Sequence, residues 1–253
     1  MKVSGFFKTR SKKEKEEPTG FLAAESTPLV FTDVSVEPFV RGLLHRPAKP
    51  SGNGLVLTHG AGSNCQAPLL VALANSFSEA GFLVLRCDLP YRQDRPYGPP
   101  GPGDAKRDRA GLSNALAAMK AQISRHLFLG GHSYGGRQAS MLCAELAEKA
   151  AGTAPAEPAG LLLLSYPLHP PRKPEQLRTQ HFFHLHTPAL FVEGTRDPFG
   201  SIAEIEQSLK LIPAKTKLLT VEGAGHDLGF KGKAVCSELT AEALREFQSF
   251  FAE

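Results

Sequence analysis

The sequence has few cysteines and no long apolar run. Four cysteines occur among 253 residues, Cys65, Cys87, Cys143 and Cys236, and none of them forms a C-x-x-C pair. This usage is typical of reduced, mostly buried thiols in a cytosolic protein. No stretch approaches the roughly eighteen apolar residues of a membrane-spanning helix, and no early apolar segment ends at a small-residue cleavage site. We therefore expect a cytoplasmic protein that is neither secreted nor inserted into a membrane.

Positive charge gathers at the beginning of the chain. The formal net charge is +4. Most of it comes from the first seventeen residues, which contain six basic and three acidic side chains. The basic ones are Lys2, Lys8, Arg10, Lys12, Lys13 and Lys15, and the acidic ones are Glu14, Glu16 and Glu17. A short tail of mixed sign without a nucleic-acid-binding module favours solvated disorder. We expect this tail over residues 1–20 and no nucleic-acid partner.

The rest of the sequence, residues 21–253, is expected to form a single α/β domain. Two β-prone runs at 29–36 and 39–44 predict a leading antiparallel hairpin. Apolar strands then alternate with helical patterns, which predicts a mostly parallel sheet with helices on both faces. These further strands are expected at 54–59, 82–87, 160–165, 188–193 and 216–221, with one more that begins at Leu127.

Two connecting segments are predicted to be irregular. Residues 90–104 are rich in proline and glycine, too rich for any regular element, and predict a long surface loop beside the strand ends. Residues 166–187 form a second excursion, short enough to act only as a minimal cap. After it, Ser201 and Glu204 have the spacing of a capping box, which predicts the start of a helix.

One stretch presents a serine at a sharp turn. Residues 131–136 read G-x-S-x-G plus a further glycine, between the strand from Leu127 and a helix expected to begin near Gly136. This pattern is typical of a nucleophile elbow, where close backbone approach excludes side chains from the flanking positions. The helix N-terminus favours developing negative charge. We predict Ser133 as a nucleophile; a glycine-rich turn with an idle serine is the alternative.

A serine hydroxyl needs a base, and the base needs a carboxylate that orients it. Asp197 and His226 follow Ser133 in the chain, each just past the end of a predicted strand. Ligands of such sheets bind outside the carboxyl ends of the strands. We therefore predict Ser133 as acyl acceptor, His226 as base and then acid, and Asp197 as the residue that orients the histidine.

Three other carboxylates compete with Asp197 for this role. Asp88 ends the strand that precedes the helix leading to Ser133, and it is the second choice. Glu193 lies within its strand, and Asp227 adjoins His226, which makes pairing between the two side chains awkward.

The oxyanion of a tetrahedral intermediate needs two N–H donors. The arrangement of the elbow predicts the backbone amides of Tyr134, directly after the serine, and of Ala61, in the loop His59-Gly60-Ala61-Gly62. The alternative for this loop is a plain turn.

Several other side chains are expected to line the same crevice. Substrate contacts are predicted for His59, Tyr91, Arg92, Tyr166 and His169, with structural packing as the alternative for the last two. A histidine-rich stretch offers potential metal ligands but has no carboxylate or thiol at suitable spacing, so no metal site is predicted there. Its members are His181, His184 and His186.

Six motifs carry a resemblance to a known family. They are HGAGSN from residue 59, RCDLPYR from 86, GGHSYGGR from 130, SYPLHPPRKPEQLR from 165, FVEGTRDPFG from 191 and GAGHDL from 223. Over about residues 25–252 the chain resembles the α/β-hydrolase superfamily. Within it the chain is similar to the dienelactone-hydrolase-like branch, which includes bacterial predicted hydrolases, a testis-expressed protein and a subunit of chromatin acetylation complexes. The resemblance implies the α/β-hydrolase fold and a serine hydrolase.

Dienelactone hydrolases carry a cysteine at the elbow, so the serine here favours ester hydrolysis. We expect a serine hydrolase that cleaves carboxylic esters of modest acyl size through an acyl-enzyme, without metal or organic cofactor and with a small-molecule ester as its partner. Two alternatives stay open. One is a non-catalytic interaction module, and the other is thioester cleavage, acyl transfer or perhydrolysis by the same three residues.

Overall fold

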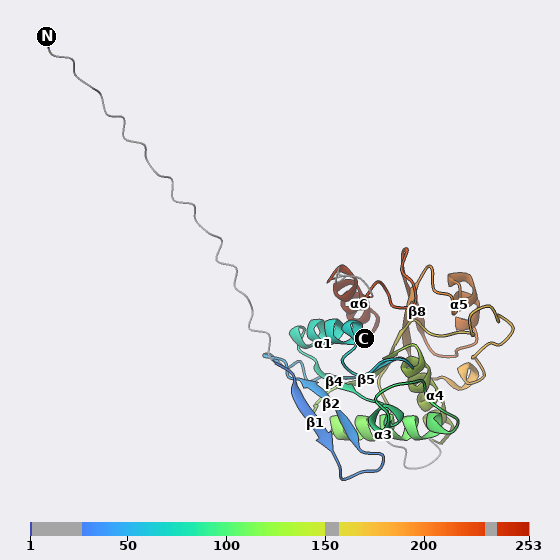
Figure 1. Cartoon of the computed structure of the whole chain (residues 1–253), viewed down its shortest axis with the longest axis horizontal. Helices are drawn as coiled ribbons and strands as arrows, with labels where there is room; N and C mark the ends of the chain where they lie inside the picture. Colours follow the sequence, from blue (N-terminus) through green and yellow to red (C-terminus); the bar gives the residue numbers. More distant parts are fainter. Residues whose placement is uncertain (2–26, 150–156, 231–236, 253) are drawn as a thin grey trace.

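The computed structural model describes residues 1, 27–149, 157–230 and 237–252 (Figure 1). The expected tail beyond Met1, most of the connector at 152–158 and Cys236 lie outside the described residues. The strands are β1 Leu29–Asp33, β2 Val40–His45, β3 Gly54–Thr58, β4 Leu83–Cys87, β5 Leu127–His132, β6 Leu161–Leu164, β7 Ala189–Gly194 and β8 Thr216–Val221. The helices are α1 Pro68–Glu79, α2 Pro90–Asp94, α3 Asp104–Lys120, α4 Tyr134–Lys149, the 3₁₀ turn η1 Phe182–His184, α5 Ile202–Leu209 and α6 Ser237–Phe250.

The described strands form one sheet in the order β1-β2-β4-β3-β5-β6-β7-β8. β1 pairs antiparallel with β2, and β2 antiparallel with β4. Every pair from β4 to β8 is parallel. This arrangement confirms the predicted mostly parallel sheet with a leading antiparallel hairpin.

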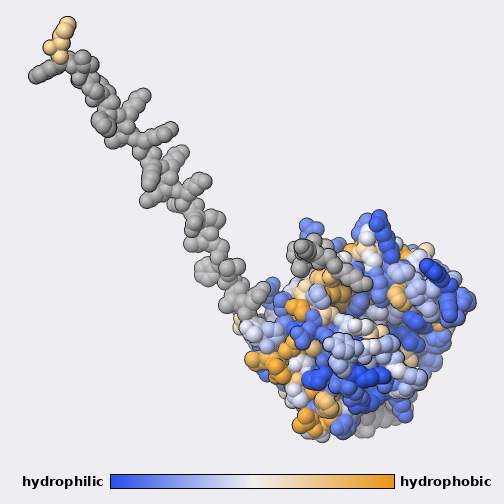
Figure 2. Space-filling model, viewed as in Figure 1, coloured by the Kyte–Doolittle hydropathy of each residue, from blue (hydrophilic) through white to orange (hydrophobic). Residues whose placement is uncertain are grey.

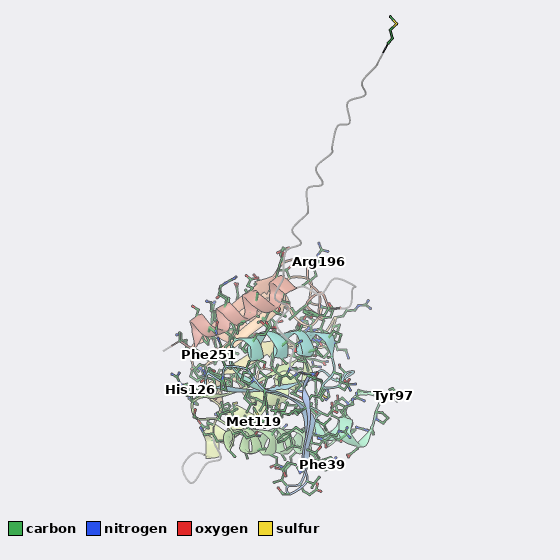
Figure 3. The ribbon with its side chains drawn as sticks, turned by 90° about the vertical axis from the view of Figure 1, so that its left-hand side faces the viewer. Phe39, Tyr97, Met119, His126, Arg196 and Phe251 are labelled. Carbon is green, nitrogen blue, oxygen red and sulfur yellow. The ribbon has the colours of Figure 1, made fainter. Side chains whose placement is uncertain are left out.

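The central strands are buried on both faces because helices cover both. Along β3, Leu55 and Leu57 face a cluster formed with α1 and α6, whereas Val56 faces a second cluster formed with α3 and α4. This split follows from the two-residue period of a strand. Figure 3, seen from the β1 side, shows α1 and α6 above the strands and α3 below them.

The predicted loop at 90–104 is partly wrong, because α2 occupies its first five residues. Pro90 stands in the first turn, where its fixed φ suits a helix and its missing N–H costs nothing. The next residue, Tyr91, donates its N–H to Asp108 Oδ1 in α3 at 3.1 Å. The prolines and glycines that exclude regular structure are concentrated after α2.

Three smaller outcomes concern element ends. β1 ends at Asp33 rather than near residue 36. The Asp33 side chain accepts the N–H of Ser35 through Oδ1 at 2.9 Å, and this bond turns the chain. The elbow helix begins at Tyr134, two residues earlier than expected. The capping box is confirmed: Ser201 and Glu204 exchange side-chain to backbone bonds at the start of α5.

Exposed apolar residues gather around the first strand. Figure 2 shows apolar colour on the side of the molecule where β1 lies in Figure 1. Leu29, Val30 and Val34, in and just after this strand, are each more than half exposed. Among the described helices, none combines the length and the apolar character that crossing a bilayer requires.

The core between α1, α6 and the sheet yields a stability prediction. Phe247 of α6 packs against the rings of Phe77, Phe82 and Phe128, with centroid distances of 5.0, 5.9 and 4.8 Å. Phe247→Ala should lower the free energy of unfolding by about 3–5 kcal/mol, because it removes buried area and leaves a cavity. Urea denaturation measures the loss. The control Phe183→Ala removes an exposed ring and should change stability by less than about 0.5 kcal/mol.

Candidate active site

The turn between β5 and α4 holds Ser133 in an uncommon conformation, with φ at 53°. A non-glycine residue adopts positive φ only where its surroundings enforce it. Here the enforcement is close backbone approach. A Cβ on Gly131 would lie 2.6 Å from the backbone of Gly135 and Gly136, and one on Gly135 would lie 2.5 Å from the His59 carbonyl oxygen. The glycine pattern of the elbow is therefore a steric requirement.

Ser133, His226 and Asp197 lie in one hydrogen-bonded line. The distance from Ser133 Oγ to His226 Nε2 is 2.7 Å, and that from His226 Nδ1 to Asp197 Oδ2 is also 2.7 Å. An ionised carboxylate only accepts, so Nδ1–H donates to Asp197 and Nε2 accepts the serine hydroxyl. The Asp197 side chain is 1% exposed and that of His226 is 23% exposed, so of these two side chains only the imidazole meets solvent appreciably.

The loops that carry Asp197 and His226 are packed against each other. Asp197 follows β7 and is held in a turn by its own N–H, which donates to Gly194 O at 3.1 Å. A Cβ on Gly194 would meet the carbonyl oxygens of Ala224 and Gly225 at 2.3 and 2.7 Å, in the loop that leads to His226. The carboxylate and the imidazole are thus brought together by backbone contact.

Two neighbours of His226 were not predicted from the sequence. The ring of Phe199 lies over the imidazole, with centroids 4.2 Å apart and an interplanar angle of 30°. His132 Nε2 donates to the carbonyl oxygen of His226 at 2.7 Å. Burial lowers the pKa of His132 to about 4, so it acts as a neutral donor. The position of His132 next to Ser133 is the one feature of the sequence that could have indicated its role. Nothing in the sequence indicates that Phe199 lies beside His226.

The competing carboxylates have other partners. Asp88 accepts the N–H of Cys65 at 2.8 Å and pairs with Arg41 at 3.3 Å. Glu193 accepts the N–H of Tyr166 at 2.6 Å, and burial raises the pKa of this carboxyl well above its ordinary value. Asp227 accepts the N–H of Gly229 at 3.0 Å. Only Asp197, among these four, contacts the imidazole of His226.

The two amides predicted for the oxyanion lie near the serine. Tyr134 begins α4 directly after it. The loop with Ala61 packs on the elbow, since a Cβ on Gly60 would lie 3.4 Å from Ser133 Cβ and 3.0 Å from His132 Nδ1. The oxyanion role of both amides stays a prediction.

Three residues that were expected to contact substrate are instead buried and make hydrogen bonds to backbone groups in and around the loop after β3. His59 is fully buried, and its Nε2 accepts the N–H of Leu89 at 3.1 Å. The hydroxyl of Tyr91, which is 1% exposed, donates to Ala61 O at 2.9 Å. Arg92, also buried, donates to backbone carbonyls. The polar atoms of these three residues bond to groups inside the protein. The expectation that they contact substrate is therefore corrected: they support the loop after β3.

The excursion at 166–187 folds down onto the body of the protein. Tyr166, Leu168 and Phe182 belong to the core, and the Tyr166 hydroxyl donates to Arg178 O at 2.7 Å. His169 is buried, with Nδ1 donating to Pro170 O at 2.8 Å. Both predicted contacts, Tyr166 and His169, are thus packing residues of a small cap.

The histidines of this excursion point to separate partners. His181 Nε2 lies 2.8 Å from Ser140 Oγ, and His184 Nδ1 lies 3.4 Å from Glu148 Oε1. His186 is exposed. Within the described ranges, no group of three or more His, Cys, Asp or Glu residues is arranged to hold a metal ion.

Comparison with models of known protein families identifies the family of this chain. The model of the alpha/beta hydrolase domain family matches residues 51–251, so the chain belongs to this family. The resemblance to the α/β-hydrolase superfamily is thereby confirmed.

Solved structures share the fold at low sequence identity. An alpha-beta serine hydrolase homologue from Coxiella burnetii is 17% identical, with a TM-score of 0.66 over 87% of this chain and 98% of that one. A dienelactone hydrolase from Anabaena variabilis is 20% identical, with a TM-score of 0.63 over 88% and 98% of the two chains. XC6422 from Xanthomonas campestris, a serine hydrolase without lid, is 14% identical, with a TM-score of 0.63 over 88% and 95%.

The steric requirement at the elbow can be tested with two glycines. Gly135→Ala should lower the free energy of unfolding by about 2 kcal/mol, because the new methyl group would lie 2.5 Å from the carbonyl oxygen of His59 and 2.7 Å from the Thr58 Cγ2 methyl group. Gly62→Ala is the matched control in the neighbouring loop, where a Cβ would have nothing within 4 Å. Urea denaturation of both variants checks the difference. Equal stability of the two would contradict the steric argument.

The buried histidine His59 predicts a pH dependence of stability. Burial lowers its pKa to about 4, whereas an unfolded histidine titrates near ~6.5. Between these values the unfolded chain binds a proton that the native chain does not. The free energy of unfolding should therefore fall as pH drops from about 6.5 towards 4, with a contribution of at most ~1.4 kcal/mol per pH unit from this residue.

Urea denaturation at pH 7, 6 and 5 measures this slope. His59→Gln removes the titrating ring, so its stability should depend less on pH than that of the wild type. Identical slopes would show that His59 does not carry the effect.

Proposed function

We propose that this protein is a serine hydrolase that cleaves carboxylic esters of modest acyl size through an acyl-enzyme. The observation that carries the proposal is the unbroken line from Ser133 Oγ through the imidazole of His226 to Asp197, with both distances at 2.7 Å. Membership of the alpha/beta hydrolase domain family supports the same reaction class. The three residues follow one another in the chain in the order Ser, Asp, His, which is the order of the catalytic residues in α/β-hydrolases.

The proposed reaction uses side chains and backbone amides only. Ser133 Oγ attacks the ester carbonyl carbon, and its proton passes to His226 Nε2. The amides of Ala61 and Tyr134 bind the oxyanion, each contributing about 3 kcal/mol by analogy with a measured side-chain donor. Collapse expels the alcohol, which takes the proton from Nε2. Water then hydrolyses the acyl-enzyme by the same steps, with His226 again as base and Asp197 orienting it.

The small cap supports a shallow, open site. Because the excursion buries Tyr166, Leu168 and Phe182 in the core, these apolar side chains are not available to enclose a long acyl chain. Phe199 adds an apolar wall over His226, which suits a compact acyl or alkoxy group.

The finer assignments belong to the same proposal. We propose that the chain belongs to the dienelactone-hydrolase-like branch, on the strength of its motif at residues 165–178, and that the serine at the elbow makes esters its substrates. We further propose a single domain over residues 21–253 in the cytoplasm, with a small-molecule ester as its partner. A thioester or another acyl acceptor would use the same three residues, and a panel of ester and thioester substrates separates these reactions.

Removal of the serine hydroxyl tests the function. Ser133→Ala should lower turnover of p-nitrophenyl acetate by at least ~10⁴-fold, because no nucleophile remains. Ser140→Ala is the control: it removes another buried serine hydroxyl, which faces His181, and turnover should be unchanged. Labelling of the wild type by a fluorophosphonate, absent in Ser133→Ala, checks the same residue. A wild type that is not labelled would favour a non-catalytic interaction module.

A further inference from the structure

The loop after β3 contains a peptide whose orientation matters for the proposed reaction. The peptide between Gly60 and Ala61 packs on the elbow, with the position of a Gly60 Cβ 3.4 Å from Ser133 Cβ. In a trans peptide, C=O and N–H point in opposite directions. Whatever holds the carbonyl of Gly60 therefore sets the direction of the Ala61 N–H. Among the described residues, that N–H meets no hydrogen-bond acceptor.

The Gly60 carbonyl is held from inside the protein. His59 Nε2 accepts the N–H of Leu89, so the proton of this neutral imidazole is on Nδ1. Nδ1–H then donates to Gly60 O at 2.9 Å. The N–H of Ser63 donates to the same oxygen at 3.1 Å. The Tyr91 hydroxyl is a third, longer donor to this oxygen, at 3.4 Å. These three donors fix the plane of the peptide between Gly60 and Ala61.

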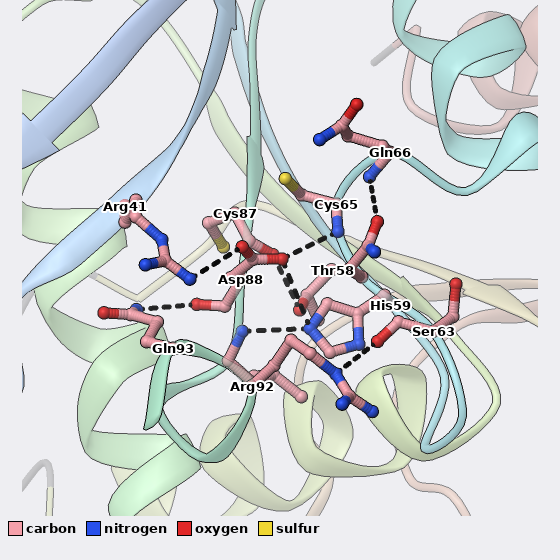
Figure 4. A network of polar contacts seen from close by, with 12 residues as sticks. Arg41, Thr58, His59, Ser63, Cys65, Gln66, Cys87, Asp88, Arg92 and Gln93 are labelled. Atoms are coloured by element: carbon pink, nitrogen blue, oxygen red, sulfur yellow. Dashed lines mark hydrogen bonds and ion pairs between the residues drawn. The ribbon is translucent and has the colours of Figure 1, made fainter. Parts of the chain in front are cut away.

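The next carbonyls of the loop are held by two neighbours on α2. Ala61 O accepts the Tyr91 hydroxyl at 2.9 Å and Arg92 Nη2 at 3.1 Å. Arg92 Nε donates to Ser63 O at 2.7 Å, a bond drawn in Figure 4. The remaining donors of Arg92 reach the carbonyls of Arg95 and Gly98 at 3.0 and 2.8 Å. Four carbonyl oxygens therefore surround one buried guanidinium.

Helix α2 is itself tied to the elbow. Asp108 in α3 is fully buried, and its Oδ1 accepts the N–H of Tyr91 at 3.1 Å. Its Oδ2 accepts the hydroxyl of Tyr134 at 2.7 Å. One carboxylate thus joins the helix that holds Ala61 to the residue that supplies the second predicted oxyanion donor.

We propose that Tyr91 and Arg92 are positioning residues that aim the Ala61 N–H at the carbonyl oxygen of an ester bound to Ser133. Tyr91 reaches the carbonyl of Gly60, which belongs to the same peptide as the Ala61 N–H, and it also holds the carbonyl of Ala61. Arg92 holds the carbonyls of Ala61 and Ser63, and neither residue touches substrate. The proposal rests on the proposed ester hydrolysis and adds residues outside the serine, histidine and aspartate. It also gives the short helix in the proline-rich segment a role in the reaction.

Tyr91→Phe tests this proposal because it removes one hydroxyl and keeps the ring. With p-nitrophenyl acetate, kcat should fall about 30-fold while KM stays within about twofold, as expected when a donor is misdirected only toward the transition state. The inhibitor 1,1,1-trifluoroheptan-2-one forms a tetrahedral adduct with a reactive serine. Its inhibition constant should rise by the same factor as kcat/KM falls, because the adduct needs the same donors.

The control is Ser51→Ala, which also removes a hydroxyl that donates to a backbone carbonyl, that of Gly81 at 2.9 Å, before β3 begins. Its kcat and inhibition constant should equal those of the wild type. Thermal melting reports whether each variant is folded. If Tyr91→Phe fails to fold, Arg92→Lys replaces it with the same expectations, since one ammonium cannot serve four carbonyls.

Two results would overturn the positioning role. One is wild-type kcat/KM in the folded variant. The other is a fall in kcat/KM with no change in the inhibition constant, which would indicate a general structural effect. Failure of the proposed function is recognised separately, as wild-type turnover that survives Ser133→Ala, and it would overturn the positioning role as well.

Discussion

The parallel pairing of β5, β6, β7 and β8 is the constraint on which the site depends. Its backbone hydrogen bonds continue to the last residues before the loops: Ser133 N–H donates to Leu164 O at 2.8 Å, Ser165 N–H to Val192 O at 2.9 Å, and Thr195 N–H to Val221 O at 3.1 Å. Because these bonds join neighbouring strands at one edge, they fix where each loop starts. Ser133, Asp197 and His226 are far apart in the sequence, and they lie close together because the sheet holds the starts of their loops in fixed positions.

A second layer of buried polar groups supports that edge. His45 and His59 have their pKa values lowered to about 4 by burial, so both are neutral, and each accepts a hydrogen bond through Nε2. Around Asp88, Figure 4 shows bonds to Arg41 and Cys65 that connect the antiparallel hairpin with the loop after β3. Buried polar groups are tolerated only when they are paired. The pairing here also immobilises the loop beside the serine.

Much of this could be predicted from the sequence, because the relevant signals are local. Apolar strands, helix periodicity and the glycines around Ser133 predicted the sheet and the elbow. The roles of His59, Tyr91 and Arg92 could not be predicted. Their partners are backbone carbonyls of distant or irregular segments, and a carbonyl has no signature in the sequence. Helix α2 was missed for a related reason: the bond from Tyr91 to Asp108 joins residues in different elements.

The contacts at Gly131 and Gly135 have an evolutionary consequence. Those glycines are required by backbone packing, whether or not a reaction takes place, whereas under the proposed function the hydroxyl at 133 and the imidazole at 226 are required only by the reaction. A descendant that lost activity would therefore keep the glycines and change the serine or the histidine. In a survey of homologues, the glycine spacing would therefore indicate a shared architecture. Under the proposed function, only the side chains at 133, 197 and 226 would distinguish active enzymes from inactive ones.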